Sequence, residues 1–239
     1  MRAFIGVEIP ILPIIDVVIP VYNEEQSLGS VLTDIPKRLV REIIVCDNGS
    51  TDGTAQIAKD FGATVVSELR KGYGSACLTG LAHIAATTKK PAIVVFMDGD
   101  DSDYGEELAR LIEPILYDEV DMVIGSRALG KMERGSMTVP QVFGNWLATR
   151  LLRLYYGYKF TDLGPFRAIR YDKLVALKME DRNFGWTVEM QIKAAKQKLR
   201  CVEVPVSYRR RIGVSKVSGT IRGTVMAGYK ILWTLYRYR

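Results

Sequence analysis

The 239-residue chain lacks the features that would place it among disulfide-bonded, zinc-binding or membrane-spanning proteins. Cys46, Cys77 and Cys201 are odd in number, widely spaced and without a C-x-x-C pair, which favours a reduced, cytoplasmic protein. No stretch of about 18 uncharged apolar residues occurs, so no transmembrane helix is predicted. Glu8, Asp16 and several prolines interrupt the apolar N-terminal stretch, so no signal peptide is expected.

The excess of positive charge is confined to one segment of the chain. Residues 200–239 contain nine Lys and Arg against one acid, Glu203. Of the net charge of +6 this segment therefore accounts for +8, and residues 1–199 carry −2. A local basic cluster suits phosphate groups or an anionic membrane surface better than a nucleic acid, so we expect no nucleic-acid partner.

Short apolar runs alternate with amphipathic stretches, which is the pattern of a wound α/β sheet. Polar clusters follow the early strands, and ligands of open α/β sheets bind at the carboxyl ends of strands. We therefore expect residues 14–127 to bind a nucleotide and residues 128–219 to complete an acceptor side. Strands are predicted at 16–21, 42–47, 64–67, 92–98, 121–125, 166–170 and 201–207, and helices at 25–38, 52–61, 75–88, 104–117, 141–156 and 185–198.

The strongest chemical signal is FMDGDDSD, residues 96–103. Asp98 and Asp100 flank Gly99 just after a predicted buried strand, so both carboxylates can reach one hard cation whose oxygen shell a diphosphate completes. An isolated D-x-D is more often a solvated acidic turn. The preceding strand and the neighbouring motifs favour the metal site here.

A second motif, VIPVYNEE, occupies residues 18–25. Pro20 and Tyr22 can line a base or ribose, and Asn23 and Glu24 supply polar contacts. The alternative is an ordinary strand-to-helix turn capped by Asn23.

Two further motifs suit a nucleotide. In CDNGSTDGT, Asp47 can accept hydrogen bonds from the N–H groups of uracil or guanine. In RKGYG, Gly72 lets the backbone approach phosphates and Lys71 adds charge. The glycines also form a partial dinucleotide-binding G-x-G-x-x-G, but Cys77 occupies its third glycine position and the motif follows the third strand, which disfavours that alternative.

These motifs, in this order and with GSR at 125–127, resemble family 2 glycosyltransferases of the GT-A fold. DLGPFRAIR (162–170), FGWTVEMQIKA (184–194) and VEVPVSYRRRIGVSK (202–216) narrow the resemblance to the dolichyl- or polyprenyl-phosphate sugar synthases. It implies an α/β fold: a single Rossmann-like GT-A domain over 1–219, with a mixed, mostly parallel sheet. Related members often have T-S-G-F-R at 163–167, and the spacing of the basic motif leaves open whether Arg210 or Arg211 has the main role.

The resemblance also implies roles for individual residues. Glu189 has the alternative of a buried structural acid, and His83, the one histidine, is expected to be structural. The implied catalytic residues are Asp100, Arg127, Arg211 and Glu189, and the implied ligands of Mg²⁺ or Mn²⁺ are Asp98 and Asp100. The residues implied to bind the donor are Pro20, Tyr22, Asn23, Glu24, Asp47, Lys71, Gly72, Asp98 and Gly99. The residues implied to bind the acceptor phosphate are Arg209, Arg210, Arg211, Ser215 and Lys216.

The predicted function is metal-dependent, inverting transfer of a sugar from a UDP- or GDP-linked donor to a polyprenyl phosphate. The alternatives are a glycosyltransferase with a non-phosphorylated acceptor, a nucleotidyltransferase and a non-catalytic nucleotide-binding module.

Residues 220–239 are expected to form an amphipathic basic helix that lies on the cytoplasmic face of a membrane, or else packs on the protein's own core. The sequence does not indicate an oligomeric state. The predicted apolar face of the helix comprises Ile221, Val225, Tyr229, Leu232 and Tyr236.

Overall fold

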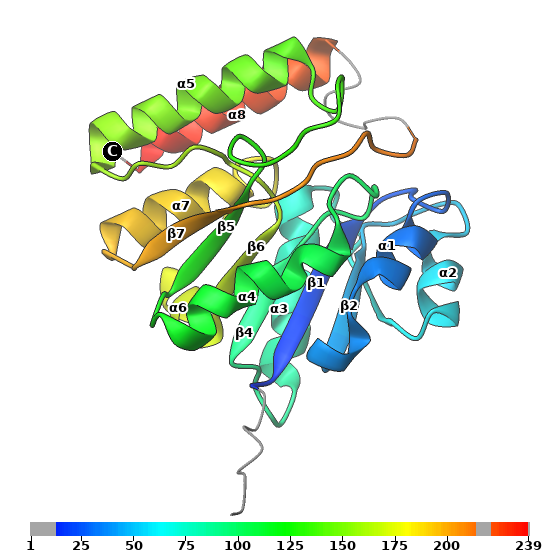
Figure 1. The fold of residues 1–239 in the computed structure, drawn as a ribbon. Coiled ribbons are helices and arrows are strands. Elements are labelled where there is room, and N and C mark those ends of the chain that lie inside the picture. Colours follow the sequence, from blue (N-terminus) through cyan, green and yellow to red (C-terminus); the bar gives the residue numbers. More distant parts are fainter. Residues whose placement is uncertain (1–12, 214–220, 239) are drawn as a thin grey trace, which may run out of the picture.

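The computed structural model describes residues 13–213 and 221–238. Its centre is a seven-stranded sheet with the order β3-β2-β1-β4-β6-β5-β7 (Figure 1). β6 is antiparallel to both of its neighbours, and all other neighbouring strands are parallel. The predicted mixed, mostly parallel sheet is therefore confirmed. The strands are β1 (Ile15–Val21), β2 (Glu42–Asp47), β3 (Thr64–Ser67), β4 (Ile93–Phe96), β5 (Met122–Ser126), β6 (Arg167–Arg170) and β7 (Cys201–Pro205).

Helices cover both faces of the sheet, as a mostly parallel sheet requires. Every residue of β1 is buried, and its side chains alternate between two cores: Val18 lies in one, Val17 and Ile19 in the other. The core around Val17 contains α1 (Leu28–Asp34), α2 (Thr54–Asp60) and α4 (Leu108–Tyr117). The core around Val18 contains α3 (Tyr73–Ala86), α5 (Val139–Tyr156), α6 (Tyr171–Leu177), α7 (Trp186–Lys196) and α8 (Ile221–Arg237).

The predicted elements are present, with local differences at their ends. α1 is shorter than the predicted 25–38, because Pro36 follows its last turn and cannot continue a helix. α6, which follows β6 without a loop, was not predicted, since seven residues are too few to show a helical period. Two short 3₁₀ turns, Lys37–Leu39 and Gly105–Glu107, complete the described elements.

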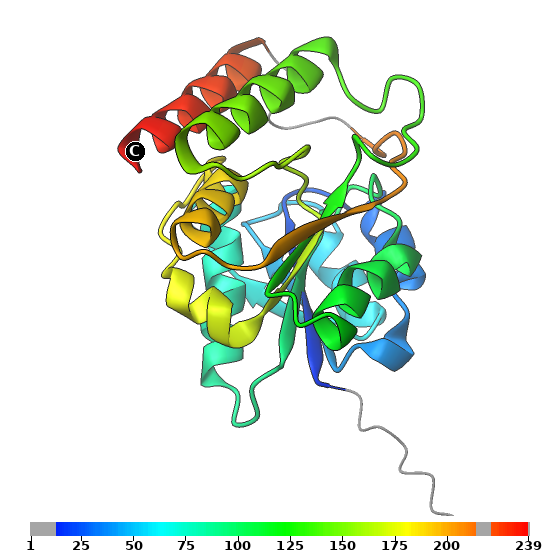
Figure 2. The same ribbon diagram turned by 60° about the vertical axis from the view of Figure 1, so that its left-hand side comes forward.

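The C-terminal helix α8 lies beside α5 on one edge of the molecule (Figures 1 and 2). Its inner face is part of the fold, since Thr234 and Leu235 are each 2% exposed. Tyr229, Leu232, Trp233 and Tyr236 remain exposed on its outer face. The side chains of Ile221 and Val225, also predicted for this face, lie outside the described residues. None of the helices described is both long and apolar enough to cross a membrane.

Candidate active site

A cavity of about 540 Å³ opens where β1, β4 and β5 end. This is the edge at which the sequence predicted a ligand. Nine of the predicted residues line it: Pro20, Tyr22, Glu24, Lys71, Gly72, Asp98, Gly99, Asp100 and Arg127; a tenth, Arg211, comes from the segment after β7.

The acidic loop after β4 forms the floor of the site. Gly99 is required there because a Cβ would lie 2.6 Å from Cγ1 of Val21 on the neighbouring strand. The Tyr73 hydroxyl donates to Oδ1 of Asp98 at 3.0 Å, and the Ser102 amide donates to Oδ1 of Asp100 at 3.0 Å. Burial, with the negative charge of Asp100 nearby, raises the pKa of Asp98 to about 7. A cation beside these carboxylates would offset the free-energy cost of keeping both of them ionised.

An acid without a partner fits this loop to a divalent cation, and an arginine neutralises part of the charge of its neighbours. Asp103 is buried, and within the described chain neither of its carboxylate oxygens has a hydrogen-bond partner. The guanidinium of Arg211 lies against the acids, with Nη1 3.1 Å from Oδ2 of Asp100 and Nη2 3.2 Å from Oε1 of Glu24. The described residues contain no group of three or more His, Cys, Asp or Glu side chains arranged around one metal position. The protein would therefore supply the Asp98 and Asp100 carboxylates, and a bound diphosphate further oxygens.

The opposite wall carries an aromatic ring and a lysine. Lys71 Nζ lies 3.8 Å from the centroid of the Tyr22 ring and donates to the carbonyl oxygens of Asn48 and Gly49. Gly72 has φ = 139°, a conformation that favours glycine, and its amide donates to Oδ1 of Asn48. The wall thus combines a flat ring, a fixed cation and exposed backbone, which suits a base and phosphates.

Asn23 and Asp47 lie at the predicted strand ends but are not part of the cavity wall. Asn23 has φ = 53°; its side-chain oxygen accepts from the Thr51 amide, and its own amide donates to the Ser50 hydroxyl. Asp47 accepts from the Ser50 amide at 3.0 Å. Both residues thus stabilise the two strand-end loops, and the neighbouring Asn48 lines the cavity instead.

The arginine triplet separates into three environments. Arg211 reaches the cavity, whereas Arg210, the other residue considered for the main role, is not part of its wall. Arg210 turns away and donates to the carbonyl oxygen of Arg134. Arg209 pairs with Asp34 and Asp101, outside the cavity wall. Ser215 and Lys216 lie outside the described residues.

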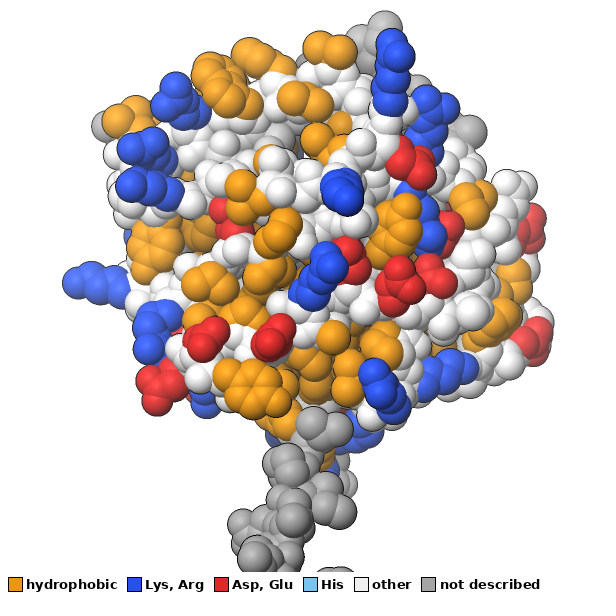
Figure 3. Space-filling view, viewed as in Figure 1, with side chains coloured by type: hydrophobic (Ala, Val, Ile, Leu, Met, Phe, Trp, Pro, Cys, Tyr) orange, Lys and Arg blue, Asp and Glu red, His pale blue; other side chains and the backbone are white. Residues whose placement is uncertain are grey.

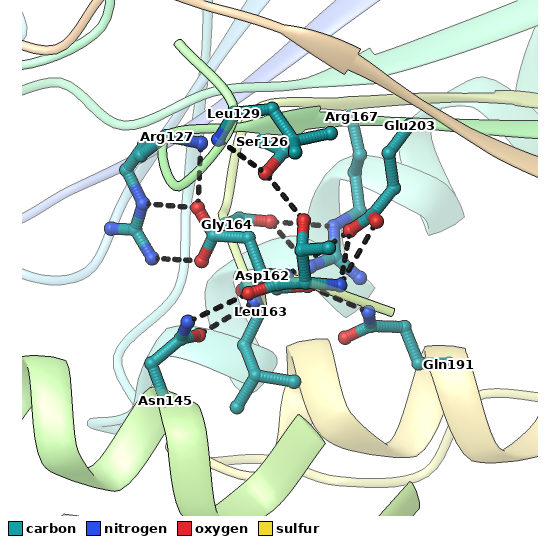
Figure 4. A network of polar contacts seen from close by, with 11 residues as sticks. Ser126, Arg127, Leu129, Asn145, Asp162, Leu163, Gly164, Arg167, Gln191 and Glu203 are labelled. Carbon is teal, nitrogen blue, oxygen red and sulfur yellow. Dashed lines mark hydrogen bonds and ion pairs between the residues drawn. The ribbon is translucent and has the colours of Figure 1, made fainter. Parts of the chain in front are cut away.

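Arg127 is held by Asp162, which directly precedes the segment 163–167 where the sequence departs from its resemblance. Its backbone amide and Nε donate to Oδ2 of Asp162, and its Nη2 donates to Oδ1, all within 2.8 Å (Figure 4). Asn145 on α5 accepts from the Leu163 amide, and Gln191 on α7 donates to the carbonyl of Asp162. Two helices and a buried carboxylate thus fix the guanidinium at the cavity.

The same network contains a second, fully buried arginine. Arg167 donates to the carbonyl oxygens of Leu163 and Gly164 (Figure 4) and to that of Thr187. Burial lowers the pKa of Arg167 to about 10, which leaves it charged at neutral pH. Arg167 therefore shapes the loop and does not face the ligand.

Glu189 is placed away from the cavity, contrary to its expected catalytic role. It is fully buried in α7, accepts from the amides of Glu180 and Asp181, and pairs with Lys193 at 2.7 Å. This is the position of a structural acid, the alternative that the sequence allowed.

Several cavity residues were not predicted. Asn48, Tyr73, Phe184 and Tyr208 all lie within the motifs that carry the resemblance, and all of them except Phe184 are next to residues that were selected. The one signal for these residues in the sequence is that each lies inside such a motif. Gln141, at the start of α5, had no signal beyond its capping position after Thr138.

Comparisons with known proteins show the family of the chain. Residues 16–177 match the model of glycosyl transferase family 2. A dolichyl-phosphate hexose transferase of Haloferax volcanii is 33% identical over 205 residues, covering 84% of this chain and 85% of its own. An undecaprenyl-phosphate mannosyltransferase of Micrococcus luteus is 32% identical over 223 residues, covering 86% and 88%.

A solved structure shares the fold. It is the glucosyl-3-phosphoglycerate synthase of Mycobacterium tuberculosis in complex with Mn²⁺, UDP-glucose and glycerol 3-phosphate. The identity is 25% and the TM-score 0.73, over 95% of this chain and 80% of that one.

A mixed α/β sheet with an acidic loop and two arginines at its carboxyl edge defines a glycosyltransferase of the GT-A class. The chain belongs to glycosyl transferase family 2.

Proposed function

We propose that this glycosyltransferase moves a sugar from a UDP- or GDP-linked donor to a polyprenyl phosphate, with Mg²⁺ or Mn²⁺ bound by Asp98 and Asp100. The observation that carries the proposal is that carboxylates and guanidinium groups line the same cavity. Asp98 and Asp100 line the cavity together with the guanidinium groups of Arg127 and Arg211, and Nη1 of Arg211 lies 3.1 Å from Oδ2 of Asp100. Such a cavity suits two anionic substrates that would otherwise repel each other.

Arg211 is the residue that we assign to the acceptor phosphate. Its Nε–H is buried and, over the described ranges, has no hydrogen-bond partner. A phosphate oxygen can accept from it in a charge-assisted bond. The printed names of two relatives, a dolichyl-phosphate hexose transferase and an undecaprenyl-phosphate mannosyltransferase, support a lipid phosphate as the acceptor.

The chemistry then needs no strong general base. An oxygen of the acceptor phosphate, already an anion at neutral pH, forms the new bond to the anomeric carbon from the side opposite the leaving group. The bond from that carbon to the nucleoside diphosphate breaks with inversion, and its electron pair leaves on the diphosphate oxygen. Asp98 and Asp100 would hold a divalent ion that could neutralise this charge, while Lys71 and Arg127 hold phosphate oxygens in place.

We also propose that the protein attaches to the cytoplasmic face of an anionic membrane through α5 and α8. Hydrophobic side chains flanked by Lys and Arg gather over these two helices (Figure 3). Val142, Phe143 and Trp146 of α5 are about half exposed or more, as are Tyr229 and Trp233 of α8. Aromatic residues of this kind favour the level of lipid headgroups.

The charge of α5 and α8 supports the same attachment. Together the two helices contain five basic residues and no acid. A second copy of the chain would bring like charges together, whereas an anionic bilayer complements them. The five are Arg150, Arg153, Arg222, Lys230 and Arg237.

A donor and acceptor panel tests the proposed reaction. UDP- and GDP-sugars are incubated with Mn²⁺ or Mg²⁺ and with a polyprenyl phosphate, glycerol 3-phosphate or an unphosphorylated polyprenol. Sugar transfer to the polyprenyl phosphate alone is expected. Preferred transfer to glycerol 3-phosphate or to the polyprenol would contradict the acceptor assignment and favour a soluble phosphate or a hydroxyl acceptor, respectively.

Asp100→Asn tests the metal assignment in the same assay. The substitution removes a charge from a loop after a strand, so the fold is expected to persist. Turnover is expected to fall at least about 100-fold, because the leaving diphosphate loses part of its charge neutralisation. Near-normal turnover of the folded variant would contradict the assignment.

A further inference from the structure

The segment 180–185, between α6 and α7, caps the helix that begins at the donor wall. The amides of Gly74 and Ser75, in the first turn of α3, donate to the carbonyl oxygens of Asn183 (3.2 Å) and Arg182 (3.0 Å). Amides at this end of a helix have no partner within the helix. No side chain caps α3 at Gly72. The neighbouring segment therefore does so with its backbone.

The backbone of this segment packs so closely against the start of α3 that neither can shift without displacing the other. A Cβ at Gly72 would lie 2.1 Å from the carbonyl oxygen of Arg182, and a Cβ at Gly74 would lie 2.0 Å from that of Asp181. Tyr73, which lies between these glycines, donates to Asp98. A shift of segment 180–185 would therefore displace the donor wall and a hydrogen bond to a metal ligand.

The other side of the segment is held by α8. Asp181 is 7% exposed, and its Oδ2 lies 2.9 Å from Nζ of Lys230. Its Oδ1 accepts from the amides of Asn183 and Gly185, which closes the turn. A Cβ at Gly185 would lie 2.6 Å from the Thr234 hydroxyl oxygen, so α8 packs directly on the turn.

We propose that Lys230 is a positioning residue for the donor subsite, acting through Asp181 and segment 180–185. The inference rests on the proposed function for the identity of the donor. Without Lys230, the buried carboxylate of Asp181 loses its ion pair, and the turn that it closes relaxes. The carbonyl oxygens that cap α3 then move, and Lys71, Gly72 and Tyr73 move with them.

The proposal also connects two surfaces of the protein. Lys230 follows directly on Tyr229, which lies on the exposed face assigned to the membrane. The helix that meets the lipid therefore also holds the donor wall. Lys230, on its inner side, positions the nucleotide subsite through Asp181, and Tyr229, on its outer side, contacts the bilayer.

Hydrogen exchange and nucleotide binding test the role of Lys230 without any acceptor. In Lys230→Met, exchange at the amides of Gly74 and Ser75 is expected to quicken at least about tenfold, while exchange in β1 stays unchanged. The dissociation constant of whichever nucleotide binds the wild type, UDP or GDP with Mn²⁺, is expected to rise about tenfold. Lys230→Arg, which keeps the charge, should stay within about twofold of the wild type.

Arg237→Met is the matched control on the same helix. Arg237 pairs with Glu180 at 3.5 Å, and both side chains are more than half exposed. Neither exchange nor nucleotide affinity should change in this variant. If Lys230→Met does not fold, Asp181→Asn/Lys230→Met removes both charges, and the same changes are expected from it.

Two outcomes would overturn the proposal. One is unchanged exchange and affinity in a folded Lys230→Met protein. The other is equal acceleration at Gly74 and throughout β1, which would mean general destabilisation. A wild-type protein that binds neither UDP nor GDP would refute the donor assignment, and the exchange experiment would still decide the role of Lys230.

Discussion

At the scale of single residues, Arg211 lies where the acidic and basic sides of the cavity meet. It contacts Asp100 and Glu24 with its terminal nitrogens, while its buried Nε–H has no hydrogen-bond partner among the residues that the structure describes. Its neighbour Arg210, with nearly the same sequence environment, binds the carbonyl of Arg134 instead. The two residues are therefore a matched pair for testing the acceptor site.

Arg211→Ala is expected to lower kcat/KM for a polyprenyl phosphate about 10- to 100-fold, since a charge-assisted hydrogen bond contributes about 1.5–3 kcal/mol. Arg210→Ala should change it less than about twofold. Steady-state kinetics with varied acceptor, at saturating donor, provide the measurement. Equal activity of the wild type and Arg211→Ala would point to an acceptor without a phosphate.

Asp162 is the residue that holds Arg127 in place, and its loss should affect stability as well as turnover. It is 1% exposed and accepts three hydrogen bonds from Arg127. Asp162→Asn leaves a buried guanidinium without its counter-charge, which is expected to lower the free energy of unfolding by about 3–5 kcal/mol. Urea denaturation measures this. The control is Asp172→Asn, which breaks an exposed ion pair with Arg170 (3.5 Å) and is expected to change the free energy of unfolding by less than about 1 kcal/mol. Equal stability of Asp162→Asn and the wild type would contradict this role.

At the scale of elements, α8 has two faces with different partners. Thr234 and Leu235 face the protein, and Tyr229 and Trp233 face outward with their rings stacked 6.5 Å apart. Removing the whole helix would uncover the core, so a truncation cannot isolate a membrane role. Substitutions on the outer face can.

Tyr229→Ser/Trp233→Ser is expected to reduce binding to anionic liposomes at least about tenfold, because two aromatic rings no longer enter the interface. Thermal stability should change little. Tyr117→Ser, a change at a 77% exposed tyrosine on α4, is the control. Liposome sedimentation at low and high salt gives the result. Undiminished binding of the double variant would exclude α8 as the attachment surface.

At the scale of the whole molecule, the cavity draws its walls from segments far apart in the chain, from Pro20 to Arg211. A ligand that contacts all of them stabilises the folded state as a whole. UDP or GDP at 100 times its dissociation constant should add about 2.7 kcal/mol to the free energy of unfolding. The effect should require Mn²⁺ or Mg²⁺ and disappear in Asp100→Asn. A metal-independent increase in melting temperature would contradict the assignment of Asp98 and Asp100.

The positions of the strands along the chain and of the donor motifs could be predicted from the sequence, whereas the order of the strands in the sheet was not. Buried strands appear as short apolar runs, and the carboxyl ends of parallel strands meet at one edge, so Tyr22, Lys71 and Asp98 could be brought together without coordinates. Glu189 could not be placed in this way. A glutamate in a predicted helix looks the same whether it faces a ligand or a buried turn.

What the sequence determined by itself was therefore local: the apolar periods, the D-x-D after a strand and the family resemblance. The tertiary structure decided which of three adjacent arginines enters the cavity, because each contacts a different partner. Arg209 pairs with Asp34, Arg210 donates to the Arg134 carbonyl, and Arg211 pairs with Asp100. It also decided that α8 holds the turn at Asp181. Ion pairs between distant segments depend on three-dimensional proximity, which no local pattern in the chain records.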